Sequence, residues 1–186
     1  MKSKIFKPLI AVFAVIVFVL ILTVPTYNKL TTLEEGVNQS YAQVQNVVQR
    51  RADLIPNLVN TVKGYANHES DTLTEVTKAR AGIQEAKTPS ELAVANQKLT
   101  TAINVVKEAY PELKADTQFT QLMDELSGTE NRISLERKRY NEEVQKYNTS
   151  LKKFPTVLIA KFTGHTNKEY FQAEEKAQDA PVVDFN

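Results

Sequence analysis

The chain has 186 residues, enough for one domain and a membrane anchor, and its formal net charge of +1 excludes the basic balance expected of a nucleic-acid-binding domain. The absence of cysteine excludes disulfides, thiolate metal sites, a cysteine nucleophile and the lipid attachment of bacterial lipoproteins. With only 5 glycines and 7 prolines, the composition favours long helices.

The first element is an apolar stretch that predicts a membrane anchor. After a short basic N-terminus at residues 1–8, residues 9–28 contain no charge, and about 20 apolar residues suffice for a helix to cross a bilayer. Large residues at the end of this stretch favour an uncleaved anchor over a signal peptide. Three lysines precede the anchor and only Lys29 follows closely, so we expect a cytoplasmic N-terminus and an extracytoplasmic remainder.

The second element is a helix predicted from about residue 27 to residue 66. Its apolar residues recur at seven-residue steps and form one stripe that other helices must bury. Glu34 and Arg51 interrupt this stripe, where a charge is costly unless it is paired or lies at a wet edge. Pro56 removes one backbone hydrogen bond, so we expect a kink near Ala52.

Further helices follow from their start and stop signals. Thr88 and Glu91 are typical of a capping box, and Pro111 and Pro155 end two of the helices. The last long helix carries a heptad pattern over five repeats, as coiled coils do. The predicted segments are helices at 69–87, 89–110, 116–154 and 156–163, and a polar C-terminal tail at 165–186.

These elements predict an all-α fold, an elongated antiparallel up-down bundle of three to four long helices over residues 29–164, after a transmembrane helix. The break at Thr88 is expected to split one arm in two. The last long helix then ends far from the membrane. In that arrangement the apolar run Val157–Phe162 packs on the bundle or on a partner in preference to lipid.

The candidate functional residues are polar positions on or beside the helical stripes: Arg50, Arg51, Asp53, Glu130, Asn131, Arg132 and Arg137. Buried ion pairs that fix the helix register are the favoured interpretation, with a ligand or proton pocket and a partner surface as alternatives. A count of helical levels places Arg51 nearer to Arg137 than to Glu130, so no pair is assigned.

Other side chains favour structural roles. His68 lacks the second histidine of a zincin motif, and His165 has no ligand set beside it in the sequence. No familiar catalytic motif occurs, so no metal, cofactor or enzymatic activity is expected. Four tyrosines on the stripes are predicted to fill the core with hydrogen-bonded hydroxyl groups: Tyr41, Tyr65, Tyr140 and Tyr147.

From Tyr27 to Phe171 the sequence resembles the LemA family. The resemblance is carried chiefly by the motif QRRADLIPNLV at 49–59 and the motif TENRI at 129–133. It implies a bacterial, membrane-anchored helical bundle without an assigned enzymatic activity. It also implies relatives that are linked with envelope proteases or with membrane organelles.

We therefore expect a non-catalytic adaptor or scaffold in the bacterial inner membrane that contacts the lipid bilayer through residues 9–28. Its expected partner is another cell-envelope component, for which a membrane protease is one option, and not a nucleic acid. The alternative is a ligand-sensing helical bundle that works through a separate signalling partner. The heptads also allow a homo-oligomer, because they can pair between molecules instead of within one.

Overall fold

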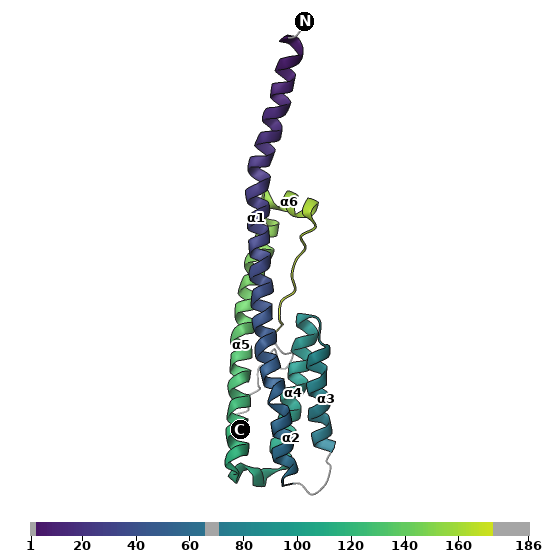
Figure 1. Cartoon of the computed structure of the whole chain (residues 1–186), viewed down its shortest axis with the longest axis vertical. Coiled ribbons are helices and arrows are strands. Elements are labelled where there is room, and N and C mark those ends of the chain that lie inside the picture. The colour runs from purple at the N-terminus through teal and green to yellow at the C-terminus, as the bar shows by residue number, and fades with distance from the viewer. Residues whose placement is uncertain (1–2, 66–70, 173–186) are drawn as a thin grey trace, which may run out of the picture. The chain divides into compact units, whose positions relative to one another are not determined.

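The computed structural model describes residues 3–65 and 71–172, with side chains described from Ile10 onward. The regular structure of these residues is helical, which confirms the all-α class. The elements are α1 (Ser3–Asp53), α2 (Ile55–Lys63), α3 (Asp71–Glu85), α4 (Pro89–Ala109), the 3₁₀-helix η1 (Pro111–Ala115), α5 (Thr117–Lys152) and α6 (Thr156–Thr163) (Figure 1). The predicted helix start near residue 27 is wrong, because α1 continues from the apolar stretch without interruption.

The chain divides into two compact units. Unit 1 comprises Met1–Gln39 and Glu142–Lys168, and unit 2 comprises Ser40–Asn141 and Glu169–Asn186. Helices α1 and α5 each contribute one part to unit 1 and another part to unit 2. Each unit buries apolar side chains of its own.

In unit 1, the first part of α1 presents large apolar side chains that no other described part of the unit covers. They are exposed nearly without interruption from Ile10 to Val24. Among the residues that the structure describes, α1 is the one helix that is long and apolar enough to cross a membrane. By length and composition, this stretch therefore agrees with the predicted single anchor.

Beyond the anchor, unit 1 is built from the next turns of α1 and the last turns of α5, which lie side by side (Figure 1). Gly36 of α1 approaches Glu143 of α5 closely enough that an added Cβ would lie 3.5 Å from the carboxylate. Glu34 is paired as its place on the stripe requires, because Lys168 Nζ lies 2.6 Å from Oε1 and His165 Nε2 lies 3.5 Å from Oε2.

In unit 2, α3 and α4 lie side by side as an antiparallel hairpin (Figure 1). The turn at residues 86–88 therefore reverses the chain, so α3 and α4 are separate antiparallel helices and not, as expected, two parts of one arm. With this additional reversal, α5 runs back antiparallel to α1. The last turns of α5 and the residues that follow them, together Glu142–Lys168, pack in unit 1 with the part of α1 that directly follows the anchor. The expectation that the last long helix ends far from the anchor is therefore also wrong.

Local signals set the starts of α4 and α5 as predicted. Thr88 Oγ1 accepts a hydrogen bond from the Glu91 N–H at 3.1 Å, and the Glu91 carboxylate accepts one from the Thr88 N–H at 3.2 Å. Hydrogen bonds from the Lys87 and Thr88 N–H groups lower the pKa of Glu91. Asp116 caps α5 by accepting a hydrogen bond from the Phe119 N–H at 2.8 Å.

The non-helical segment after α6 is bound to α5 by two asparagines. In unit 2, Asn141 Nδ2 donates to the Phe171 carbonyl and Asn141 Oδ1 accepts from the Phe171 N–H, both at 2.9 Å. In unit 1, Asn148 makes the same two bonds with the backbone of Lys168, also at 2.9 Å. The first part of the predicted polar tail is therefore held in place, and residues 173–186 lie outside the described residues.

Substitution of Asn141 by aspartate is expected to loosen this attachment, because a carboxylate has no N–H to donate to the Phe171 carbonyl. The amide hydrogen of Phe171 is then expected to exchange with solvent faster, while the amides in the middle of α5 keep their protection. Hydrogen exchange followed by mass spectrometry measures both. Unchanged exchange at Phe171 in the Asn141→Asp variant would show that this clamp does not hold the segment.

Candidate functional site

Arg51, in the last turn of α1, is the centre of a buried polar network in unit 2. Its side chain is only 4% exposed, and its Nη1 atom donates to Asn96 Oδ1 at 2.9 Å and to Thr100 Oγ1 at 2.8 Å. The same atom forms an ion pair with the Glu130 carboxylate. Asn96 Nδ2 donates to Glu130 Oε2 at 3.2 Å. The network thus joins three helices, α1, α4 and α5, through one cation.

The electrostatics of the network favour a structural role. Burial lowers the pKa of the Arg51 guanidinium, and the Glu130 carboxylate opposes this effect. Arginine nevertheless keeps its proton and cannot serve as a base. Its Nη1 already donates to two side chains and pairs with a third, which supports the predicted interpretation of a buried ion pair that fixes the helix register.

The Arg51–Glu130 pair contradicts the alignment of α1 with α5 that counting helical turns in the sequence predicted. In unit 2 the Tyr65 hydroxyl donates to Asp116 and so joins the end of α2 to the start of α5. Arg51 lies fourteen residues before Tyr65 and Glu130 lies fourteen residues after Asp116, so the two face each other. The expectation that Arg51 lies nearer to Arg137 is wrong. The chain leaves for the α3–α4 hairpin after α2 and returns to α5 beside the end of α2, so the hairpin does not shift the register of α5 against α1.

The predicted kink is present, and the Arg80 side chain donates a hydrogen bond to the backbone carbonyl that Pro56 leaves without a helical donor. Helix α1 ends at Asp53, and Pro56 lies in the first turn of α2. Pro56 has no N–H, so the carbonyl of Ala52, four residues earlier, has no helical donor. Arg80 Nε of α3 donates to this carbonyl at 3.0 Å, and Arg80 Nη2 lies 4.0 Å from Asp53 Oδ1. Ala52 is fully buried, so its carbonyl needs this donor.

Replacement of Arg80 by alanine is expected to lower the free energy of unfolding by about 1–3 kcal/mol, because it leaves a buried carbonyl without a donor. In a Pro56→Ala background, residue 56 regains an N–H that can donate to Ala52, so the same substitution is expected to cost less. Urea unfolding of the four variants measures this coupling as a double-mutant cycle. Lys78→Ala, which removes an exposed ion pair with Glu75, is the control and is expected to cost at most about 1 kcal/mol.

An equal cost of Arg80→Ala in both backgrounds would contradict the proposed compensation between the two residues.

The other predicted polar positions do not join the Arg51 network. Arg50 is exposed and pairs with Glu125 at 3.2 Å. Asn131 and Arg132 are exposed. Arg137 binds the C-terminal segment, because Nη2 donates to the Gln172 carbonyl at 2.8 Å and the guanidinium lies 5.1 Å from the centre of the Phe171 ring.

Two residues of the Arg51 network, and Arg80 at the kink, were missed in the sequence. Asn96 and Thr100 lie four residues apart among the buried apolar positions of α4, and that spacing was the available signal. Arg80 stood on the apolar stripe of α3, where an unpaired charge is costly. In each case a polar residue at a core position indicated a buried partner, although its identity depends on the register of the helices.

The predicted role of the tyrosines holds only in part. Tyr140 is 3% exposed and donates to the Glu169 carbonyl at 2.8 Å. Tyr147 is fully buried, but its hydroxyl and that of Tyr41 have no hydrogen-bond partner in the described structure. Tyr65 is 57% exposed, because α2 ends at Lys63 before reaching it, so its predicted core position is wrong.

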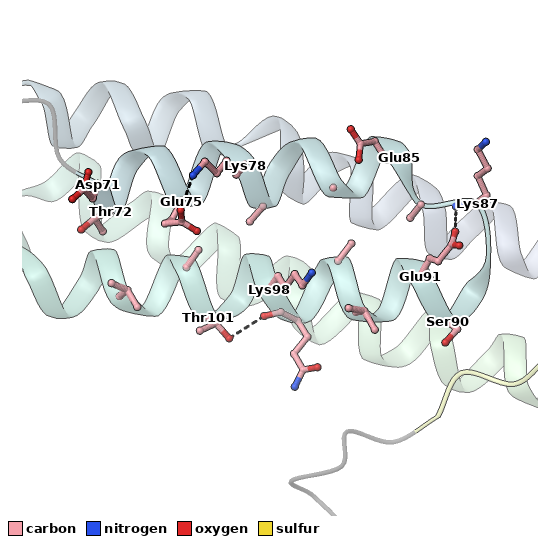
Figure 2. Close-up of a pocket in the computed structure, with 18 residues that line it drawn as sticks. Asp71, Thr72, Glu75, Lys78, Glu85, Lys87, Ser90, Glu91, Lys98 and Thr101 are labelled. Carbon is pink, nitrogen blue, oxygen red and sulfur yellow. Dashed lines mark hydrogen bonds and ion pairs between the residues drawn. The ribbon is translucent and has the colours of Figure 1, made fainter.

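A second candidate site is an open groove of about 1390 Å³ along the α3–α4 hairpin of unit 2. Figure 2 shows side chains from both helices along it. Its floor contains small residues, namely Ala79 and Gly82 of α3, Ala86 directly after α3, and Ala95 and Ala102 of α4. A Cβ added to Gly82 would meet nothing within 4 Å, so this part of the groove is open space.

The rim of the groove carries charges of both signs and two exposed valines. Its charged residues are Asp71, Glu75, Glu85, Glu91, Lys78, Lys87 and Lys98. Val94 and Val105 also line it and are 49% and 45% exposed. In the part of the chain that is described, no three His, Cys, Asp or Glu side chains are grouped so that they can hold a metal ion. A mixed rim and an apolar floor suit a protein surface better than a phosphate or a nucleic acid.

Comparison with known proteins identifies one matching family and several relatives. The model of the LemA family matches residues 40–185. Protein LemA of Metamycoplasma hominis is 26% identical over 152 residues, which cover 80% of this chain and 69% of that protein. Magnetosome protein MamQ 2 of Paramagnetospirillum magneticum is 26% identical, and magnetosome protein MamQ of Magnetospirillum gryphiswaldense is 24% identical. Each of these alignments covers 94% of this chain and 74% of the relative.

Proposed function

Because the chain belongs to the LemA family, we propose that it is a non-catalytic, membrane-anchored adaptor that binds another cell-envelope component. The observation that carries this proposal is the groove along α3 and α4, which is built from two helices packed on each other and is open to a partner. The Arg51 network does not offer such a place, because it is buried and its partners are side chains of the bundle itself.

The partner that the groove fits is a helix of another envelope protein. Small residues such as Gly82 and Ala79 allow the backbone of a second helix to approach closely. Val94 and Val105 supply exposed apolar contacts, and the acidic and basic residues of the rim can pair with charges on the flanks of that helix.

The proposed location is the inner membrane, with the bundle outside the cytoplasm. The excess of lysines before the anchor supports this orientation, and the relatives named as magnetosome proteins support a role at a membrane. On this view, one pass of α1 confines the chain to the membrane that also holds its partner. Confinement to one membrane raises the effective concentration of such a partner.

The test uses the full chain in its own cells, with Val94 replaced by the photocrosslinker p-benzoylphenylalanine. We expect illumination to give a discrete adduct with an envelope protein, identified by mass spectrometry. Filling the groove by Gly82→Leu is expected to abolish this adduct without unfolding the helix, because the new side chain enters open space. An adduct that persists at the same yield, or one that never forms, would contradict the proposal.

The matched control is Gly128→Leu on α5. Gly128 is likewise a helical glycine with nothing within 4 Å of an added Cβ, but it does not line the groove. Both substitutions are expected to improve helix propensity by up to about 1 kcal/mol, so a general effect on folding would alter both variants alike. Only Gly82→Leu is expected to remove the adduct.

A further inference from the structure

Helix α6 in unit 1 has apolar residues on both of its faces. Its inner face is buried and includes Ile159 and Ala160. On the other face, Leu158 is 50% exposed and Phe162, one turn later, is 93% exposed, and Phe154 in the preceding turn is 81% exposed. Three large apolar side chains so exposed within nine residues indicate a surface that a further apolar medium covers.

Contacts within unit 1 place α6 beside the end of the anchor. Gly164 ends α6 in the left-handed conformation, with φ of 79°, and His165 follows directly. The His165 ring meets Tyr27 edge-on at 5.9 Å, and Tyr27 lies at the end of the uncharged stretch of α1. Figure 1 shows that α6 runs across the axis of α1 rather than along it. A helix in this orientation lies parallel to a membrane that α1 crosses.

The charges around α6 fit the headgroup region of a bilayer. Lys152 and Lys153 precede α6, and Lys161 lies within it. No aspartate or glutamate occurs from Leu151 to Lys168. Lysines beside exposed aromatic and aliphatic residues are the usual composition of a helix that rests in the membrane interface, where the lysines attract anionic lipids.

We propose that α6 is a second membrane contact, which lies in the interface of the same bilayer that α1 crosses and inserts Phe154, Leu158 and Phe162 among the lipids. This inference goes beyond the adaptor function and rests only on the part of the proposal that places α1 in the membrane. It gives unit 1 two attachments to the bilayer, so that this unit is fixed in orientation instead of rotating about a single helix.

The absence of tryptophan from the chain provides a direct test. The full-length Phe162→Trp variant is reconstituted in vesicles of phosphatidylethanolamine and phosphatidylglycerol whose acyl chains are brominated close to the headgroup. Bromine quenches tryptophan only on contact, so we expect most of the emission at position 162 to be lost and its maximum to lie further to the blue than that of a water-exposed tryptophan. Replacing phosphatidylglycerol by phosphatidylcholine is expected to reduce the quenching.

Two further variants separate the possible failures. Phe18→Trp, at the middle of the uncharged stretch, reports on the anchor itself and is expected to be strongly quenched by lipids whose acyl chains are brominated near their ends. Asn38→Trp is also exposed in unit 1, but it lies about 15 Å beyond Asn28 along α1 and is expected to remain unquenched. Quenching at position 18 without quenching at position 162 would overturn the proposal for α6 alone. Absence of quenching at both positions would overturn it together with the membrane anchor.

Discussion

Glu130→Gln is expected to lower the free energy of unfolding by about 3 kcal/mol, because it removes the counter-charge of a guanidinium that is buried among α1, α4 and α5. This is the low end of the range for buried ion pairs, since the Glu130 side chain is itself 34% exposed. Asn96 and Thr100 still accept hydrogen bonds from Arg51 in this variant, but neither carries a compensating charge. Urea unfolding of the full chain in mild detergent, followed by circular dichroism, measures the loss.

The matched control is Glu125→Gln on the same helix. It breaks the exposed ion pair with Arg50, in which both side chains are about half exposed, and is expected to cost at most about 1 kcal/mol. Adding Arg51→Met to Glu130→Gln is expected to restore part of the stability, because the unpaired buried cation is then gone. Similar losses for Glu125→Gln and Glu130→Gln would show that the Arg51 network is not a buried ion pair of consequence.

The protein is expected to lose stability steeply between pH 10 and pH 12. Burial raises the pKa of Tyr147 to about 12, with a smaller contribution from Glu34, and raises that of Tyr140 to about 12, with smaller contributions from Tyr41 and Glu169. An unfolded tyrosine ionises at about pH 10, so in this window the unfolded chain releases protons that the folded chain keeps. Stability therefore falls as the pH rises, by about 2–3 kcal/mol for each of the two tyrosines.

Tyr147→Phe is expected to remove about half of this alkaline loss. At neutral pH it is expected to be neutral or slightly stabilising, because the Tyr147 hydroxyl has no hydrogen-bond partner among the described residues. Tyr140→Phe removes the other half, but it also removes the hydrogen bond to the Glu169 carbonyl. Urea unfolding at pH 8, pH 10 and pH 12 gives the slopes. A double variant with the same alkaline loss as the unchanged protein would contradict burial as the cause.

The features that were predictable from the sequence are those set by neighbouring residues. Thr88 and Glu91 mark the start of α4, Asp116 that of α5, and Pro56 the break after α1, because caps and prolines act within one helical turn. The heptad stripes likewise identify buried positions such as Val44 without any knowledge of the partner helices.

The features that were not predictable depend on how distant segments meet. Whether the break at Thr88 bends or reverses an arm depends on the packing of α3 on α4, and this choice decides where α5 ends. The pairing of Arg51 with Glu130 follows only once the register is known. The binding of the segment after α6 rests on backbone hydrogen bonds from Asn141 and Asn148, for which its polar sequence gives no periodic signal.

The proposed adaptor function depends first on which side of the membrane the bundle occupies. The chain has no cysteine, so Ser134→Cys on the exposed face of α5 introduces a single reactive site, and Ser3→Cys places one on the opposite side of the anchor. Intact cells are treated with a membrane-impermeant maleimide. We expect Ser134→Cys to be labelled without lysis and Ser3→Cys only after lysis. Labelling in the reverse order would place the bundle in the cytoplasm and contradict the binding of an envelope partner outside it.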